Sequence, residues 1–192
     1  QGSYMTNFLI NIKNHYLRVA IAKLVDEAMK TYGGSEYQFS QQWNADGMAQ
    51  ANVIFTEMVA GGWYLRHDLF QHAPEQYTLF IFQDNEQATA EEGLPNCLRQ
   101  AVFMPPHAPV QLLKDEIASA IQRSLPPHHD PSFNRLRRCI NCACKTVSDA
   151  QTKVIYAFSI GLSPHEVAAA LKISHKTIHS HKKNIMCKFN LN

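Results

Sequence analysis

Short apolar runs alternate with helix-like patterns along the first 125 residues of the chain. Runs rich in β-branched and aromatic residues predict five strands, at residues 7–12, 37–39, 52–55, 77–82 and 101–104. Clear helical periods cover residues 16–29 and 109–123. Weaker ones cover 63–71 and 85–100, the latter interrupted near Gly93 and Pro95. Alternation of this kind predicts a doubly wound α/β domain, with a parallel five-stranded sheet and helices on both faces.

Each of the two clear helices carries one apolar face, which we expect to pack on the sheet. In the first helix the face consists of Leu17, Ala20, Ile21, Leu24, Val25 and Ala28. In the last helix it consists of Leu112, Leu113, Ile117 and Ile121. A dimer contact is the alternative use of either face.

The regular elements stop at a segment rich in proline and histidine, residues 125–132, which favours a linker. Residues 135–145 are basic and rich in cysteine, and we expect a short helix or an extended arm there. The predicted organisation is an α/β domain at residues 5–125, a linker at 126–146 and a second domain at 147–192. Residues 1–4 precede Met5 and are interpreted as a cloning remnant.

Three short helices with marked starts are predicted in residues 147–192. Ser148 with Gln151, and Ser163 with Glu166, have the spacing of a capping box, and Ser174 is a third N-cap residue. Apolar positions at helical spacing then predict one small core. These positions are Val154, Ile155, Phe158, Val167, Ala168, Leu171, Ile178, Ile185 and Phe189. The second domain is therefore expected to be a small all-α bundle.

Charge is distributed unevenly between the two predicted domains. The 192 residues include 18 Lys or Arg and 16 Asp or Glu, a formal net charge of +2. Residues 1–125 carry a net charge of −5, and residues 126–192 carry a net charge of +7. A compact basic segment joined to an acidic one is typical of nucleic-acid binding by one module. A basic solvated surface without a partner would give the same numbers.

Apolar runs in the sequence are too short to span a bilayer, and the N-terminus lacks the basic and apolar regions of a signal peptide. We therefore expect a cytoplasmic protein with no membrane partner, associated with the nucleoid when bound to DNA.

The third predicted helix, at about residues 175–189, combines an apolar face with basic and hydrogen-bonding side chains on its other faces. A helix of this kind after a short turn suits the major groove of DNA, where polar groups reach base edges and lysines reach phosphates. The candidate DNA-binding residues are Lys176, Thr177, His179, Ser180, His181, Lys182, Lys183 and Lys188. The alternative is a lysine-rich, solvated helix on a three-helix bundle.

An ordered series of residues in the last domain matches a known motif. The series is Val147-Ser148, Gly161-Leu162-Ser163, Glu166-Val167-Ala168, Leu171, Ile173-Ser174, Thr177-Ile178-His179, His181, Asn184-Ile185 and Lys188-Phe189. It resembles the helix-turn-helix of the LuxR/NarL/FixJ type. The resemblance implies base contacts by His179, Ser180 and Lys183. It implies backbone contacts by Lys176, Thr177, His181, Lys182 and Lys188.

Two features depart from that family. Gln151 and Lys153 stand where its first helix usually has acidic residues. The family's fourth helix, commonly a dimerisation element, would begin just past Asn192.

The strand and helix order of the first domain resembles the receiver domain of response regulators, which is often joined to this helix-turn-helix. Receivers bind Mg²⁺ through an acidic pair after the first strand and accept a phosphoryl group on an aspartate after the third. Here Lys13-Asn14 replace the acidic pair, and Glu57 takes the acceptor position. Gln83 replaces a hydroxyl residue and Pro105 replaces a lysine. We expect no phosphotransfer, and Glu57 is either a mimic of the activated charge or a plain surface carboxylate.

Three of the five cysteines lie within six residues of one another. Thiolates at this spacing suit zinc, an iron–sulfur cluster or a redox switch, and free cysteines in a linker are the simpler alternative. The candidate ligands are Cys139, Cys142 and Cys144, with His128, His129 or Cys187 as a fourth. Apart from this cluster, no cofactor is expected.

Together these features predict a transcription regulator rather than an enzyme, similar in build to atypical regulators of the RcsA type. It is expected to bind double-stranded DNA sequence-specifically, without control by aspartyl phosphorylation, as a homodimer or as a heterodimer with another response regulator. The alternatives are a metal- or thiol-dependent redox sensor and an accessory subunit that reaches DNA only with a complete response regulator. Trp63 and Tyr64, after two glycines, are a weaker candidate for a ligand site.

Overall fold

The structure, a computed structural model, describes residues 5–33, 36–58, 67–83, 98, 101–124, 136–137, 147–189 and 191. The chain divides into two compact units, residues 1–62 with 68–142 and residues 143–192 with 63–67. Each unit is built around its own hydrophobic core.

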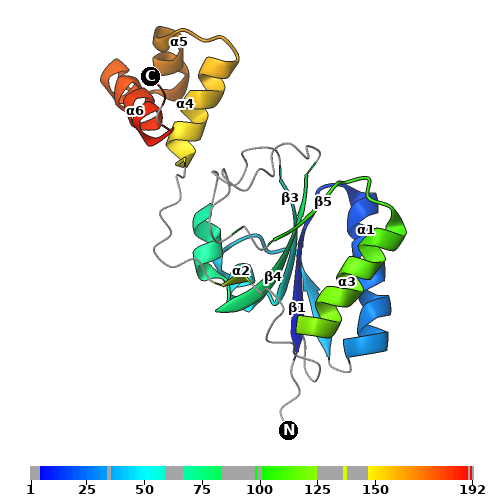
Figure 1. Ribbon diagram of the computed structural model, residues 1–192. Coiled ribbons are helices and arrows are strands. Elements are labelled where there is room, and N and C mark those ends of the chain that lie inside the picture. The colour runs from blue at the N-terminus through cyan, green and yellow to red at the C-terminus, as the bar shows by residue number, and fades with distance from the viewer. Residues whose placement is uncertain are drawn as a thin grey trace. The chain divides into compact units, whose positions relative to one another are not determined.

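A sheet of parallel strands forms the centre of the first unit (Figure 1). The strands are β1 (Thr6–Asn11), β2 (Tyr37–Ser40), β3 (Val53–Glu57), β4 (Gln76–Phe82) and β5 (Val102–Met104). They lie in the order β2-β1-β3-β4-β5, and each neighbouring pair is parallel. This is the order of a doubly wound sheet, so the predicted fold class is confirmed.

A sixth short strand, β6 (Leu136–Arg137), pairs antiparallel with the beginning of β4. Its partner residues are Gln76 and Tyr77, whereas β5 pairs with β4 further along, at residues 80–82. The expectation for residues 135–145 was a short helix or an extended arm. The described pair is extended and belongs to the sheet.

Helices cover both faces of the sheet (Figure 1). α1 (His15–Ala28) and α3 (Val110–Ser124) lie on one face, and α2 (Ala45–Gln50) lies on the other. α1 continues into a π-helical turn, η1 (Met29–Gly33). The helix expected at 63–71 is a 3₁₀ helix, η3 (His67–His72), where the structure describes it. The helix expected at 85–100 lies outside the described residues, except for the buried Leu98.

The apolar face of α1 packs on the sheet as predicted. The helix begins after Asn14, whose side-chain oxygen accepts a hydrogen bond from the N–H of Leu17 at 3.2 Å. The buried residues of this face are Ile21, Leu24, Val25 and Ala28. Leu17 is partly buried against the same core.

The prediction that Leu112 belongs to the buried face of α3 was wrong. Leu113, Ile117 and Ile121 are buried, but Leu112 is 43% exposed. Each residue turns an α-helix by about 100°, so Leu112 lies well round from the stripe that begins at Leu113. Periodicity alone did not distinguish these adjacent leucines.

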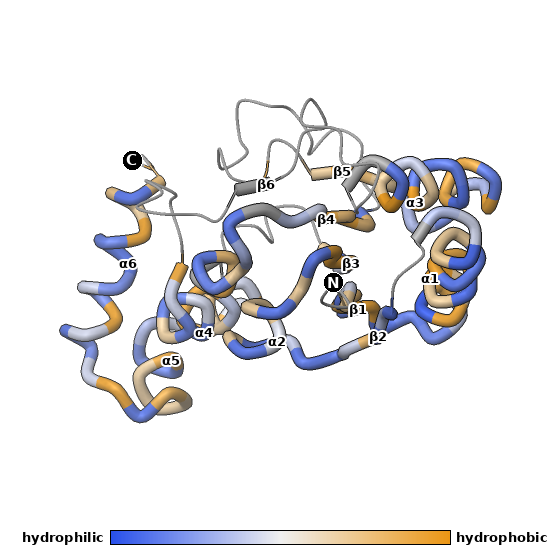
Figure 2. Tube along the Cα trace, turned by 90° about the horizontal axis from the view of Figure 1, so that it is seen from below, coloured by the Kyte–Doolittle hydropathy of each residue, from blue (hydrophilic) through white to orange (hydrophobic). Residues whose placement is uncertain are grey.

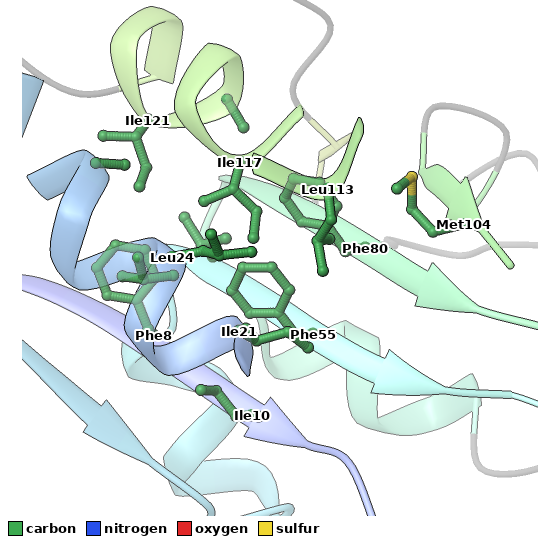
Figure 3. Close-up of a cluster of buried hydrophobic side chains, with 14 of the residues drawn as sticks. Phe8, Ile10, Ile21, Leu24, Phe55, Phe80, Met104, Leu113, Ile117 and Ile121 are labelled. Carbon is green, nitrogen blue, oxygen red and sulfur yellow. The ribbon is translucent and has the colours of Figure 1, made fainter. Parts of the chain in front are cut away.

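Aliphatic side chains and a few phenylalanines fill the core between the sheet and helices α1 and α3 (Figure 3). Phe55 of β3 and Phe80 of β4 stack with their ring centroids 4.8 Å apart. Burying a side chain of this size stabilises the fold by about 1.5–3 kcal/mol. β1 and β3 pair in a register that places Asn11 opposite Thr56, so the carboxyl ends of the two strands lie side by side.

The short helix α2 was not predicted. Its N-cap is Asn44, whose side-chain oxygen accepts from the N–H of Gly47 at 2.9 Å. A Cβ atom on Gly47 would clash with the carbonyl oxygen of Gln42, so this position requires glycine. Six residues contain too little of a helical period to be recognised from apolar spacing.

Three helices form the second unit: α4 (Asp149–Ser159), α5 (Pro164–Leu171) and α6 (His175–Phe189). Each helix packs against the other two. Capping boxes are present at Ser148 with Gln151 and at Ser163 with Glu166, as predicted. The buried core consists of Val154, Ala157, Val167 and Ile178. The expectation of a small all-α domain is confirmed.

Ile155 was wrongly assigned to this core, because it is 40% exposed. The inward face of α4 runs through Val154, Ala157 and the partly buried Phe158 instead. The small Ala157 thus contributes to the core, whereas the sequence pattern favoured the larger Ile155.

None of the helices that the structure describes has the length and apolar character needed to cross a membrane.

Candidate nucleic-acid interface

A tight turn joins α5 to α6. Lys172, the C-cap residue of α5, adopts the left-handed backbone conformation with φ 54° and ψ 43°. The N–H of Ile173 then donates to the carbonyl oxygen of Ala168 at 3.1 Å, which closes the turn. This geometry brings the chain to Ser174, the residue before α6.

Ser174 and Thr177 form the N-terminal cap of α6. The N–H of Thr177 donates to the Ser174 hydroxyl oxygen at 3.1 Å, and the two hydroxyl oxygens are 2.8 Å apart. The Ser174 side chain thereby satisfies one backbone donor that the helix leaves free. Thr177, predicted as a backbone contact to DNA, is half-buried and part of this cap.

The face of α6 opposite the core is polar and exposed. Ile178 is buried against α4 and α5, and Ile185 and Phe189 continue the inward stripe as half-buried residues. Lys176, Ser180 and Lys183, spaced by four and three residues, form the outermost stripe and are exposed. Figure 2 shows the resulting pattern, in which hydrophobic positions recur along a largely hydrophilic α6.

The remaining predicted residues flank this stripe. His179 and Lys182 are exposed, whereas His181 and Lys188 are half-buried. Cys187, one of the candidate metal ligands, is an exposed free cysteine four residues beyond Lys183. Its position at the end of the outermost stripe was not anticipated.

An open depression of about 650 Å³ runs beside α6. Its lining residues are Phe158, Pro164, His175, Lys176, Ile178, His179, Ser180, Lys182 and Lys183. The three predicted base-contact residues therefore lie on one concave surface, together with the exposed lysines.

Positive charge prevails around this surface. Residues 147–191 contain six lysines and two acidic residues, Asp149 and Glu166. The Glu166 carboxylate accepts from the N–H and the hydroxyl of Ser163, at 2.8 and 2.7 Å. These hydrogen bonds hold the pKa of Glu166 below its ordinary value. The carboxylate is thus engaged in the cap of α5.

Two histidines that sequence reasoning missed meet at the start of α5 and α6. Nδ1 of His165 and Nε2 of His175 are 3.1 Å apart, and the ring centroids are 5.3 Å apart with a 34° tilt. Both side chains are exposed. Ten residues separate them along the chain, so the pairing depends on the fold and leaves no signal in the sequence.

At the carboxyl edge of the sheet, Glu57 contacts the loop after β1. Its carboxylate accepts from the backbone N–H of Lys13 at 2.8 Å and from that of Asn14 at 3.4 Å. Gln83, in place of the receiver hydroxyl residue, is buried, and its backbone N–H donates to the carbonyl oxygen of Met104. Pro105 is exposed. The carboxylate of Glu57 binds the loop that carries the acidic pair in receivers.

The cysteine cluster, with Cys139, Cys142 and Cys144, lies outside the described residues, and so do Trp63 and Tyr64. Within the described part of the chain, no three histidine, cysteine or acidic side chains gather as a metal site.

The chain thus joins a doubly wound, receiver-like unit to a helix-turn-helix unit with an exposed basic helix, an arrangement suited to binding DNA. Residues 141–192 match the family described as bacterial regulatory proteins, luxR family. The chain therefore carries a luxR-family DNA-binding domain at residues 141–192.

Response regulators are among the solved structures that match the chain. One is the RcsB response regulator of Salmonella typhimurium, with 17% identity, TM-score 0.39, and coverage of 97% of this chain and 94% of that one. Full-length FixJ from B. japonicum has 16% identity, TM-score 0.41, and coverage of 97% and 91%. ChrA, from a heme-sensing two-component system, has 19% identity, TM-score 0.32, and coverage of 100% and 92%. At these TM-scores the likenesses say nothing about what this chain binds. No curated protein sequence matches the chain.

Proposed function

We propose that this protein is a sequence-specific regulator of transcription that inserts α6 into the major groove of double-stranded DNA. The observation that carries the proposal is the exposed stripe of Lys176, Ser180 and Lys183, opposite the buried Ile178. A helix held by its core on one side and polar on the other can enter a groove about 12 Å wide without disturbing its own packing.

Individual roles follow from position on the helix. His179, Ser180 and Lys183 are assigned to base edges, because they line the concave surface and are exposed. Lys176, Thr177, His181, Lys182 and Lys188 are assigned to the phosphate backbone, where they fix the register of the protein on the duplex.

Control of this regulator is proposed to be independent of aspartyl phosphorylation. The Glu57 carboxylate is engaged by the backbone amides of Lys13 and Asn14, and these two residues supply no acidic side chain for Mg²⁺. With such residues at the carboxyl edge of its sheet, the protein would be controlled by a partner or by its own concentration.

The regulator is proposed to act as a homodimer or together with a partner regulator, in the cytoplasm and on the nucleoid. Helix-turn-helix proteins commonly occupy two half-sites as dimers, because one recognition helix reads only a few base pairs. Sedimentation of the full chain, alone and on DNA, gives the stoichiometry. One copy per selected site, with no partner required, would contradict this part of the proposal.

The decisive experiment is binding-site selection from random duplexes with the full chain, followed by fluorescence anisotropy at several salt concentrations. Tighter binding to selected than to random DNA, by at least 10³-fold, is the expected result. Equal affinity for both would exclude sequence-specific binding.

An independent readout uses Cys187, which is exposed at the end of the proposed contact stripe. Selected DNA should slow its alkylation, measured by peptide mass mapping. Unchanged reactivity in the saturated complex would argue against this orientation of α6.

A further inference from the structure

The pair formed by His165 and His175 lies at the edge of the proposed DNA-binding surface. His175 lines the same depression as His179, Ser180 and Lys183, and Pro164, next to His165, lines it as well. Both imidazoles are exposed, and their nitrogens are 3.1 Å apart.

A hydrogen bond between two imidazole nitrogens constrains where protons reside. One of the two facing nitrogens must carry the hydrogen, and the other must offer its lone pair. In the neutral pair, the outer nitrogen of the donating ring then lacks a hydrogen, while the outer nitrogen of the accepting ring carries one. The neutral pair therefore presents one donor and one acceptor outward.

One added proton changes this pattern without breaking the pair. The donating ring becomes an imidazolium, so Nε2 of His165 and Nδ1 of His175 both carry hydrogens. Phosphate oxygens only accept hydrogen bonds, so the protonated pair matches a DNA phosphate better than the neutral pair does. The added positive charge strengthens each such bond.

Charged groups surround the pair on each packed element. α5 contributes Glu166, which is engaged with Ser163, and the turn contributes Lys172. α6 contributes Lys176, His179, Lys182 and Lys183 to the shared depression. From α4, the side chain that lines this depression is the uncharged Phe158. The Glu166 carboxylate is hydrogen-bonded to Ser163 in the cap of α5. A DNA phosphate would therefore be an additional negative charge beside His165 and His175.

We propose that His165 and His175 together form a phosphate contact that takes up one proton when DNA binds. The inference rests on the proposed DNA-binding function and adds two residues and a dependence on pH to it. Histidine is suited to this role because its charge ordinarily changes between pH 5 and 8. Affinity for DNA should therefore fall as pH rises across this range.

The test measures binding of the full chain to a random and to a selected 25-base-pair duplex from pH 6 to 8, at constant ionic strength. Uptake of one proton makes the affinity fall by up to about tenfold per pH unit. Calorimetry at one pH, in buffers of different ionisation enthalpy, counts the protons directly. Both duplexes should show the effect, because a phosphate contact carries no sequence information.

Variants His165→Gln and His175→Gln keep a polar side chain but cannot take up the proton. Each should remove most of the pH dependence, and the double variant should resemble either single one, because the pair acts as a unit. The matched controls are His72→Gln and His107→Gln, exposed histidines of the first unit, which should keep the full pH dependence. His165 is exposed, so its variant remains informative if His175→Gln weakens the fold.

Two results would overturn the inference: no proton uptake by the wild-type protein, or full pH dependence in His165→Gln. Either could occur while selected DNA still binds more tightly than random DNA, and then the proposed function survives alone. Loss of that sequence preference with the proton uptake intact would count against base recognition and leave the phosphate contact standing.

Discussion

At the scale of single residues, the Glu166 carboxylate connects helix capping to pH. Ser163 donates to it through both its hydroxyl and its backbone N–H, and these bonds lower the pKa of Glu166. A carboxyl group with a lowered pKa in the folded state stabilises the fold above its unfolded pKa. That stability is lost as pH falls through the folded value.

We therefore expect α5 to loosen at acid pH in the wild-type protein, with the loss beginning below about pH 4.5, the ordinary value for this group. Glu166→Gln keeps a capping side chain without a titrating charge, so its α5 should be less stable at pH 7 but change less with pH. Native-state amide exchange of residues 167–171, compared between the two proteins at each pH, measures this. Identical pH profiles would show that the capping bond contributes nothing.

Two lysines of α6 are expected to act differently on DNA. Lys183→Ala, on the outermost stripe, should cost about 1–3 kcal/mol with the selected site and much less with random DNA. Lys188→Ala should weaken binding to both and reduce the salt slope by about one unit, because it removes a phosphate contact. Lys153→Ala, on the exposed surface of α4, is the control. Equal losses on selected and random DNA for Lys183→Ala would remove it from base recognition.

At the scale of secondary-structure elements, the second unit depends on a very small core. Ile178 is 2% exposed and lies where α6 meets α4 and α5. Ile178→Ala should cost about 2–5 kcal/mol, enough to unfold most of a unit this small. Ile155→Ala is a matched control, because Ile155 is 40% exposed and its truncation should cost well under 1 kcal/mol.

Amide exchange distinguishes the outcomes unit by unit within the full chain. Protection across α4, α5 and α6 should collapse in Ile178→Ala, while protection in the sheet of the first unit persists. An effect of Ile155→Ala as large as that of Ile178→Ala would contradict the exposed position of Ile155 on α4.

Elements defined by local signals were predictable from the sequence. The capping boxes at Ser148 and Ser163 depend on residues three positions apart, and each strand of the parallel sheet is marked by its own short apolar run. Features fixed by distant segments were not predictable. α2 depends on the approach of Gly47 to Gln42, and β6 requires the beginning of β4 as a partner.

The candidate site also contains features that the sequence predicts and features that depend on distant segments. The exposed stripe of α6 follows from helical spacing and was anticipated. The contact of Glu57 with Lys13 and Asn14 joins residues more than 40 positions apart and was not. The sequence allowed Glu57 to be a mimic of the activated charge or a plain surface carboxylate, and neither alternative includes the hydrogen bonds that its oxygens accept from the loop after β1.

At the scale of the whole molecule, the hydrogen bonds between Glu57 and the loop after β1 predict how the protein responds to phosphodonors. Incubating the full chain with Mg²⁺ and acetyl phosphate, or with beryllofluoride, should change neither its mass nor its affinity for selected DNA. The reason is that the edge offers a hydrogen-bonded glutamate and no acidic pair at positions 13 and 14.

Intact mass spectrometry and anisotropy on the same samples provide the check, with Glu57→Ala as the control for any adduct. A phosphoryl adduct that disappears in Glu57→Ala would contradict phosphorylation-independent control. An adduct that persists in this variant would place the modification on another residue.

The left-handed backbone conformation of Lys172 is strained, so the second unit could be stabilised by a substitution at this position. Non-glycine residues in this conformation are strained by about 1–2 kcal/mol, and glycine relieves most of that strain. Lys172→Gly should thus raise the midpoint of thermal unfolding of the second unit, while removing one positive charge near α6. An unchanged or lower midpoint would contradict this. In that background, substitutions that probe DNA contacts could be made in a unit that tolerates more of them, which separates loss of folding from loss of recognition.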